Sequence, residues 1–472
     1  MSDFKIYSRG IVKNSDGNIL LLKKKSNQKI GGGAWLLPGG TMEYGENIEH
    51  TLIREIKEET NLEVQSIELV LNKKMLIDKS HWLGAYYLCT VKDESALKNL
   101  EPDKHDTVGY FPLHEIFELR DYMMIKMAFN FPKEYYDITS VEALEHSMQL
   151  DLEKYIDAKV HTLIKDNIDS IAYIKIIGNY DRSHSVSKEE KCDKLFNYKR
   201  PTAFLDDDVL YLLCFPSIDY IKHYTNIIAS YFVNKGIPSP LISYRLPTKE
   251  FIYQTYEKCG VLSVPEAEII IFGNVDKIGL FTDIDFQKRG DFHYKLGNIN
   301  GKKVMLLGCE FSVWGNAGYY LINSLVKNFQ FNKFIYVGKL GILDNNTEPN
   351  SYLATGDTSY IGNKKVSWNN IFENQEDSKI KFGSHITCPS VIEETIYNIG
   401  KYRKKGLFID PEIGNMALGC NKNNIDFSYL HIISDNVIVP HIENLSNERK
   451  TEILKKRKKL FLSIGGIIKD TL

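Results

Sequence analysis

Residues 38–62, PGGTMEYGENIEHTLIREIKEETNL, decide the fold of the N-terminal part of this chain. A glycine-rich turn stands directly before a run of helix-forming residues. Glu55, Glu58 and Glu59 occupy positions i, i+3 and i+4, so a helix places their carboxylates on one arc of its surface. Arg54 precedes Glu58 by four residues and can orient that carboxylate through a charged hydrogen bond. The stretch therefore predicts a helix with an acidic face.

An acidic face of this kind predicts a bound divalent metal. Without one, the carboxylates would repel each other and the pKa of at least one would rise. Mg²⁺ or Mn²⁺ relieves this repulsion, and hard cations prefer oxygen ligands. A metal held there can neutralise pyrophosphate oxygens and position a water for in-line attack. The alternative, a solvent-exposed acidic helix, explains neither the Gly39–Gly40 turn nor Glu46.

The stretch resembles the Nudix box, G-x5-E-x7-R-E-U-x-E-E-x-G-U, in which U is aliphatic. Gly40, Glu46 and the run from Arg54 to Glu59 match it, whereas the late glycine is Asn61. Asparagine tolerates the left-handed backbone that ends many helices, so the change is mild. The resemblance, closest to the MutT-like branch, implies an α/β/α domain with a mixed sheet. It also implies hydrolysis of a nucleoside triphosphate to monophosphate and pyrophosphate, with Mg²⁺ or Mn²⁺ as cofactor.

The resemblance further implies roles for the box residues. Glu58 and Glu59 would hold the metal together with the main-chain carbonyl of Gly40. Glu55 would be the general base or would orient the water, and Arg54 would orient a carboxylate. A further metal ligand is left open among three later acidic residues: Glu101, Asp103 and Asp106. The rival interpretation is a degenerate Nudix domain that only binds, but every charged position of the box is present.

The bulk properties indicate a multidomain globular protein. The chain has 472 residues, of which 43% are hydrophobic and 25% charged, with a net charge of −2. Such a balance predicts no nucleic-acid or membrane partner. The seven cysteines never form a C-x-x-C pair, and no leader or membrane-spanning run is recognised, so a cytoplasmic location is expected. The basic run Lys455–Lys459 is interpreted as a solvated helix face, because Glu452 and apolar residues flank it.

Strand and helix patterns divide the chain into three parts, residues 1–131, 132–264 and 265–472. The alternative for the middle part is that it belongs to the same domain as residues 265–472. In the first part, strands are expected over 5–12 and 19–23 as a hairpin, over 63–71 and over 84–91, with helices over 47–60 and 113–130. In the middle part, strands are expected over 170–177, 209–215 and 240–244, with a helix over 218–235. In the last part, strands are expected over 303–307, 333–337, 406–409 and 427–433, with helices over 317–328, 390–404 and 412–423. This alternation predicts an α/β fold with a mainly parallel sheet covered on both faces.

Four short stretches of the last part, read in order, form a second pattern. They are 335–343, IYVGKLGIL; 356–357, GD; 408–412, FIDPE; and 432–435, IISD. Their order and their positions at strand ends resemble the nucleoside phosphorylase and nucleosidase superfamily over about residues 265–472. Ligands of open parallel sheets bind beyond the carboxyl ends of the strands, where these residues fall.

This second resemblance implies a substrate-binding glycine turn at Gly338, with Glu412 bonded to the ribose hydroxyls and Asp435 bonded to, or protonating, the leaving base. An N-glycosidic bond breaks through a positively charged sugar, so it needs a proton donor for the base and nearby negative charge. The alternatives are a helix-end charge for Glu412 and a turn or cap residue for Asp435. Tyr336 stands where the phosphorylases often carry arginine, which argues against inorganic phosphate as the attacking group. Lys339 would instead hold a phosphate of the substrate.

One further departure from the superfamily pattern lies directly before Glu412. Pro411 replaces the methionine that usually precedes the ribose-binding glutamate. The interpretation favoured by both patterns is a bifunctional nucleotide-processing enzyme, expected to be a homo-oligomer as its superfamily relatives commonly are. The alternatives are a Nudix hydrolase with a regulatory, non-catalytic C-terminal region, and an antiviral-type nucleosidase effector that depletes a nucleotide. A nucleotide sensor would require both sites to be inactive.

Overall fold

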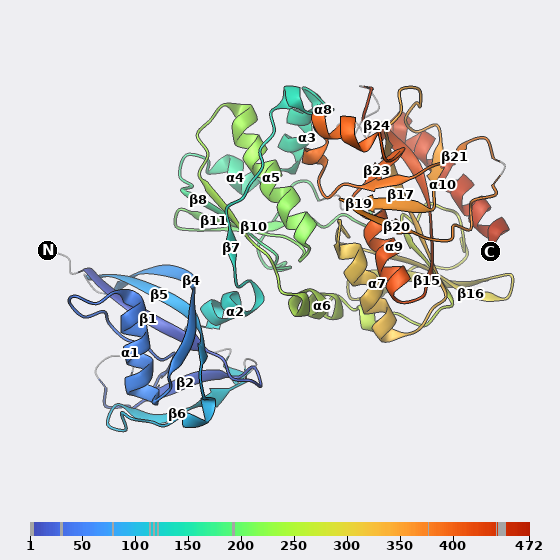
Figure 1. Cartoon of the computed structure of the whole chain (residues 1–472). Helices are drawn as coiled ribbons and strands as arrows, with labels where there is room; N and C mark the ends of the chain where they lie inside the picture. The colour runs from blue at the N-terminus through green and yellow to red at the C-terminus, as the bar shows by residue number, and fades with distance from the viewer. Residues whose placement is uncertain are drawn as a thin grey trace. The chain divides into compact units, whose positions relative to one another are not determined.

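The computed structural model describes residues 4–28, 32–77, 80–112, 115–116, 119, 122–190, 194–375, 377–439, 441 and 450–472. The chain forms two compact units, Met1–Glu134 and Tyr135–Leu472 (Figure 1). The elements of the first unit are β1 (Phe4–Val12), β2 (Ile19–Lys24), β3 (Trp35–Leu36), α1 (Ile48–Thr60), β4 (Val64–Ile77), β5 (Ser80–Val91), η1 (Glu94–Ala96), β6 (His105–Phe111) and α2 (Tyr122–Asn130).

The predicted box helix is α1, and its ends are fixed by two asparagines. The Asn47 side chain accepts a hydrogen bond from the main-chain N–H of His50, which satisfies one of the helix's open donors. Asn61 ends the helix with φ 61°, in the left-handed conformation expected for the residue that replaces the family's glycine. Leu52 and Ile56 are fully buried and anchor the apolar face of the helix.

The first unit contains two three-stranded sheets, β1-β5-β4 and β3-β2-β6. The predicted hairpin between 5–12 and 19–23 is therefore wrong. The turn itself forms, with Gly17 at φ 85°, but only one bridge, Lys13 to Ile19, joins its arms. β1 instead pairs along its length with β5 in parallel, because its side chains are buried on both faces. Ile11 belongs to one core cluster and Val12 to the other.

The predicted helix over 113–130 is found only in its second half, as α2. Residues 113–114, 117–118 and 120–121 of that prediction lie outside the described residues. Ile125 and Ala128 of α2 are buried in the core cluster that also contains Ile11. The helix therefore covers the first unit's core with one face, as an amphipathic surface helix does.

The second unit has many short elements around two sheets. They are β7 (Glu134–Tyr135), η3 (Ala143–Glu145), α3 (Asp151–Lys159), α4 (Thr162–Asp166), β8 (Tyr173–Ile177), β9 (Ser185–Val186), β10 (Thr202–Asp206), β11 (Val209–Leu213), α5 (Ile218–Lys235), β12 (Leu241–Arg245), α6 (Lys249–Lys258), η4 (Val261–Ser263), β13 (Ile269–Gly273), β14 (Gln287–Arg289), β15 (Phe292–Ile299), β16 (Lys302–Cys309), α7 (Ala317–Asn328), β17 (Lys333–Ile342), β18 (Leu353–Thr355), β19 (Thr358–Ile361), β20 (Lys364–Ser367), β21 (Ile380–Phe382), β22 (His385–Thr387), η5 (Val391–Glu393), α8 (Ile396–Tyr402), β23 (Phe408–Asp410), α9 (Ile413–Lys422), β24 (Asp426–Asn436) and α10 (Thr451–Thr471).

A six-stranded sheet has the order β7-β12-β8-β11-β10-β9, and a twelve-stranded sheet has a parallel centre of β16, β13, β17 and β24. Both faces of this centre are covered, as predicted. On β17, Phe334 packs into the cluster that includes α7 and α9, whereas Ile335 and Val337 pack into the cluster that includes α10. The outer pairs β14–β15, β15–β16 and β19–β20 are antiparallel. The protein is thus a mixed α/β protein.

The predicted helix over 390–404 is divided into η5 and α8. Ser390 caps the first segment and Thr395 caps the second, each accepting a hydrogen bond from a main-chain N–H two or three residues later. Two caps five residues apart compete with one continuous helix, because each hydroxyl satisfies its own local donors.

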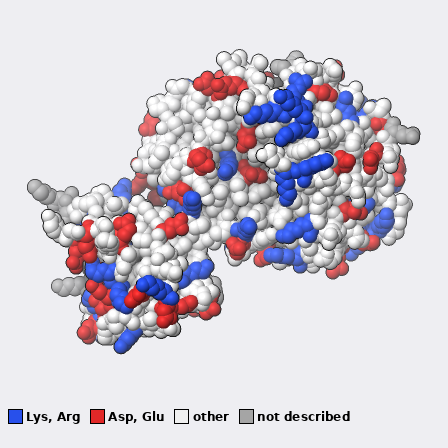
Figure 2. Space-filling model, viewed as in Figure 1, with Lys and Arg blue, Asp and Glu red and all other residues white. Residues whose placement is uncertain are grey.

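Charged side chains of both signs mix on the surface of the first unit, and lysine and arginine side chains gather on part of the second (Figure 2). Within the basic run on α10, the lysines are exposed and Arg457 is buried, with its Nε donating to Asn350 Oδ1 at 2.7 Å. This matches the predicted solvated helix face. No helix in the described part of the chain is long and apolar enough to cross a membrane.

Candidate active sites

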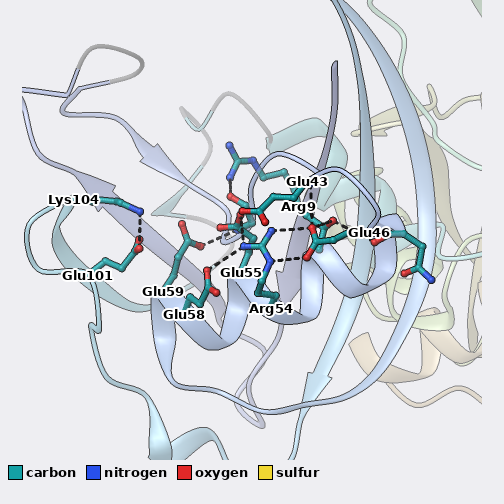
Figure 3. Close-up of polar contacts among 12 residues, drawn as sticks. Arg9, Glu43, Glu46, Arg54, Glu55, Glu58, Glu59, Glu101 and Lys104 are labelled. Atoms are coloured by element: carbon teal, nitrogen blue, oxygen red, sulfur yellow. Dashed lines mark hydrogen bonds and ion pairs between the residues drawn. The ribbon is translucent and has the colours of Figure 1, made fainter. Parts of the chain in front are cut away.

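Arg54 organises the acidic face of α1 in the first unit (Figure 3). Its Nε and Nη2 donate to the two carboxylate oxygens of Glu46 at 2.8 and 3.0 Å. Its Nη1 donates to Glu55 and to Glu58, each at 3.1 Å. The paired Arg54 hydrogen bonds lower the pKa of Glu46 to about 2. Arg54 therefore orients three carboxylates, rather than the single one that the i, i+4 spacing predicts.

Glu59 is the buried carboxylate of the box. Its side chain accepts a hydrogen bond from the Gly39 N–H at 2.9 Å, which ties the helix to the glycine turn. Burial raises the pKa of Glu59 to about 7, against the opposing effect of this hydrogen bond. Gly39 has φ 134°, and a side chain there would collide with the Ser8 carbonyl, so the turn requires glycine.

Gly40 leaves room for the carboxylate of Glu55. A Cβ built at Gly40 would overlap that carboxylate, which explains why the box begins with glycine. The Gly40 carbonyl, predicted to help hold the metal, accepts a hydrogen bond from the Ser8 N–H at 2.9 Å. This bond uses one of its two lone pairs. Burial also raises the pKa of Glu55, as a general base requires.

Of the three later acidic candidates, the structure brings Glu101 to the box. Ligand atoms of Glu59, Glu101 and His105 lie within 4.8 Å of one another. Asp103 and Asp106 are exposed and lie outside this group, and so does the half-exposed Glu58. Figure 3 shows Glu101 beside Glu59, with Lys104 donating to it at 2.6 Å. The two carboxylates suit a hard divalent cation, whereas the ring nitrogen is a ligand that transition metals accept more readily.

His105 was not predicted from the sequence. It is 3% exposed, and its Nε2 lies 3.8 Å from Glu59 Oε1. Burial lowers the pKa of His105, so its ring is neutral at neutral pH and can serve as a ligand. The sequence signal that could have identified His105 was its spacing of four residues from Glu101 at the start of a strand. This spacing by itself is not specific for a metal site.

The second unit encloses a cavity of about 980 Å³. All four predicted residues of its site line this cavity: Gly338, Lys339, Glu412 and Asp435. They come from the carboxyl ends of β17 and β24 and from the start of α9, the edge at which ligands of parallel sheets bind. Residues 135–264 also contribute to the wall, through Tyr220, His223 and Tyr224 of α5.

Glu412 is held on the cavity wall by its neighbours. The Tyr336 hydroxyl forms a side-chain hydrogen bond with it, so this tyrosine supports the carboxylate. Asp410 Oδ1 accepts from the main-chain N–H groups of Glu412 and Ile413 at 2.9 and 3.0 Å. Asp410 also lies 3.0 Å from His385 Nε2. Burial, and next the charge of Asp410, raise the pKa of Glu412 well above its usual range.

Asp435 lies at the end of β24, 7% exposed, and Ser434 Oγ donates to its Oδ1 at 2.6 Å. A second carboxyl that the sequence did not suggest, Glu394, lines the same cavity and is 6% exposed. Aromatic rings also line the cavity, where His223 stacks on Trp314 with ring centres 4.3 Å apart. The cavity thus combines carboxylates, a lysine and flat rings, which are groups that suit a nucleotide.

Residues 6–129 match the family model described as NUDIX domain. The chain is 49% identical over 53 residues to an ADP-ribose pyrophosphatase of Methanocaldococcus jannaschii, covering 11% of this chain and 30% of that protein. It is 38% identical over 60 residues to a MutT-like protein of Streptomyces ambofaciens, covering 13% of this chain and 36% of that protein. The chain thus spans about a third of the length of these two curated relatives.

Two solved structures were also found to be similar to parts of this chain. A MutT NUDIX hydrolase from Burkholderia pseudomallei is 28% identical with a TM-score of 0.22, covering 24% of this chain and 86% of that one. A putative methylthioadenosine nucleosidase from Weissella paramesenteroides is 13% identical with a TM-score of 0.33, covering 44% of this chain and 98% of that one. The chain carries a NUDIX domain at its N-terminus, as the box indicated.

Proposed function

We propose that the N-terminal unit is a metal-dependent Nudix pyrophosphohydrolase. The observation that supports this most directly is the group formed by Glu59, Glu101 and His105 beside the Arg54-oriented carboxylates. Mg²⁺ or Mn²⁺ held there, with Glu58 as a further ligand, would neutralise the charge of the pyrophosphate oxygens. Glu55 accepts the proton of the attacking water, and Arg54 keeps Glu55 in place. The substrate proposed is a nucleoside triphosphate, cut to monophosphate and pyrophosphate.

The relatives suggest a second substrate to test. The Methanocaldococcus relative is described as an ADP-ribose pyrophosphatase, and ADP-ribose also contains a pyrophosphate bond. Each nucleoside triphosphate and ADP-ribose should be incubated with the full chain and Mg²⁺, and the phosphate products separated. Glu58→Gln should lower pyrophosphate release at least about a hundredfold, because a charged ligand contributes several kcal/mol to transition-state stabilisation. Glu63→Gln, an exposed glutamate outside the metal group, is the matched control. Near wild-type turnover by Glu58→Gln would exclude the assignment of Glu58 to the metal.

We also propose that the second unit cleaves the N-glycosidic bond of a nucleotide. The supporting observation is that Glu412 and Asp435 line one cavity together with Lys339. Glu412 bonds the ribose hydroxyls, Asp435 contacts the leaving base, and Lys339 receives a phosphate of the substrate. Free base should appear when the chain is given a nucleoside monophosphate. Asp435→Asn should slow its release about a hundredfold while leaving pyrophosphate release intact.

Two rival functions make different products. If the second unit only regulates, no free base appears from any nucleotide, yet pyrophosphate is still released. If the chain is an effector that depletes a nucleotide, base is released from the intact triphosphate faster than from the monophosphate. A homo-oligomeric, cytoplasmic enzyme is proposed in each case, and the six described cysteines are free and buried, in keeping with a reducing compartment. Light scattering of the full chain tests the oligomer.

A further inference from the structure

Glu394 is a buried carboxyl that no described residue satisfies. It lies just after η5, is 6% exposed and lines the cavity of the second unit. Its Oε2 has no hydrogen-bond partner among the described residues. An isolated ionised carboxylate is strongly disfavoured away from water, so such a group is kept either neutral or close to a reacting partner.

Asp435 lines the same cavity and is also nearly buried. Burial, and then the charge of Asp435, raise the pKa of Glu394 well above its usual range. Ionising Glu394 would add a second negative charge near Asp435 in a site largely withdrawn from water, so the protonated form of Glu394 is favoured. Glu394 is therefore suited to be the acid of these two carboxyls.

Another carboxyl on the same wall shows that burial alone does not produce an acid. The Glu189 side chain is also only 6% exposed, but it is bonded to Lys159 and to Arg200, the latter at 3.0 Å. Burial would raise its pKa, yet the two cations lower it to about 2. Glu394 differs because its strongest charged neighbour is another carboxylate.

We propose that Glu394 is a catalytic acid of the second unit, which acts together with Asp435 and delivers a proton to the leaving base. This inference rests on the proposed glycosidic cleavage. The electron pair of the C1′–N bond passes to the base nitrogen, which takes the proton of Glu394. A water oxygen bonds to C1′, and the proton that the water loses returns to the carboxylate pair. The pair gains negative charge while the sugar is most positive, which stabilises the transition state.

Two other carboxyls of the cavity are already engaged by neighbouring groups. Glu412 is bonded to Tyr336, and Asp410 Oδ1 receives two main-chain N–H groups at the start of α9. Glu394 Oε2 has no hydrogen-bond partner among the described residues, so this carboxyl is available to act as the acid.

The test compares Glu394→Gln with Glu393→Gln in the full chain. Glu393 is the adjacent glutamate, and it does not line the cavity. Base release from a nucleoside monophosphate should fall at least about a hundredfold in Glu394→Gln and change less than about threefold in Glu393→Gln. Pyrophosphate release should be unchanged in both. The unfolding temperature of Glu394→Gln should not fall, because a neutral amide replaces a neutral acid.

A second substrate separates proton donation from a structural role. An N7-methylated purine nucleotide carries a cationic base that leaves neutral and needs no proton. Glu394→Gln should therefore cleave it at close to the wild-type rate. An equal loss on both substrates, or no loss on the ordinary monophosphate, overturns the inference and leaves the glycosidase assignment standing. Failure of the wild type to release base from either substrate overturns the glycosidase proposal itself.

Discussion

Metal binding to the N-terminal unit should release a proton below pH 7, and Glu59→Gln should abolish this release. The reason is the burial of Glu59, which raises the pKa of this carboxyl to about 7 in the metal-free protein. A metal requires the carboxylate form, so the proton competes with it. Burial lowers the pKa of His105 below the ordinary value for histidine, so its ring competes with the metal for a proton less than an exposed histidine would.

The size of the effect follows from that pKa. With a pKa of about 7, Glu59 is about nine-tenths protonated at pH 6 and about one-tenth protonated at pH 8. The apparent affinity for Mn²⁺ should therefore be about tenfold weaker at pH 6 than at pH 8. About 0.9 proton should be released per metal bound at pH 6, and about 0.1 at pH 8.

Calorimetric titration of the full chain with Mn²⁺, in two buffers with different ionisation enthalpies, measures both quantities. The Glu59→Gln variant should bind Mn²⁺ weakly, and residue 59 should contribute no pH dependence to its affinity. Glu63→Gln, which leaves the metal group intact, should behave as wild type. An affinity that stays flat between pH 6 and pH 8 in the wild type would refute the buried, metal-binding role of Glu59.

Three further outcomes are expected. Arg54→Lys should lower the rate of pyrophosphate release at least about tenfold without changing the unfolding temperature. The reason is that lysine cannot bond both oxygens of Glu46 and still reach Glu55 and Glu58. Equal turnover numbers for the variant and the wild type would contradict this. Lys339→Ala should reduce the preference for monophosphate over nucleoside in base release by about 5- to 150-fold, which corresponds to a charged hydrogen bond of about 1–3 kcal/mol. Added inorganic phosphate should not accelerate the wild type. Burial lowers the pKa of His146 to about 4, and its Nε2 lies 2.7 Å from the Val391 carbonyl oxygen. The folded state therefore favours the neutral ring. The free energy of unfolding keeps this contribution above pH 6.5 and loses it as the pH falls toward 4. That loss is about 3 kcal/mol, and His146→Gln should lessen the fall in unfolding temperature across this range in calorimetry; an identical fall would exclude His146 as its source.

Local sequence fixes much of the first unit's site. The spacing of Arg54, Glu55, Glu58 and Glu59 is a property of one helix, and the Asn61 end behaves as its residue type predicts. The same holds for α5 and α7, whose predicted ranges match the structure. These predictions succeed because every interaction involved lies within about four residues along the chain.

Contacts between distant segments could not be predicted in the same way. The pairing of β1 with β5 depends on burial of both faces of the strand, and the sequence could not tell this from a hairpin. Three later acidic residues were equivalent in sequence, and only the path of the chain before β6 places Glu101 beside Glu59. His105 joins them for the same reason.

In the second unit, the sequence by itself determined that Glu412 and Asp435 stand at strand and helix ends, because those positions follow from local patterns. The tertiary structure alone decided what surrounds them. It placed Tyr336 against Glu412, and it brought Glu394, some forty residues before Asp435 in the printed sequence, to the same cavity. The physical reason is that the protonation state of a carboxyl depends on burial and on neighbouring charges, and both arise only when remote segments pack together.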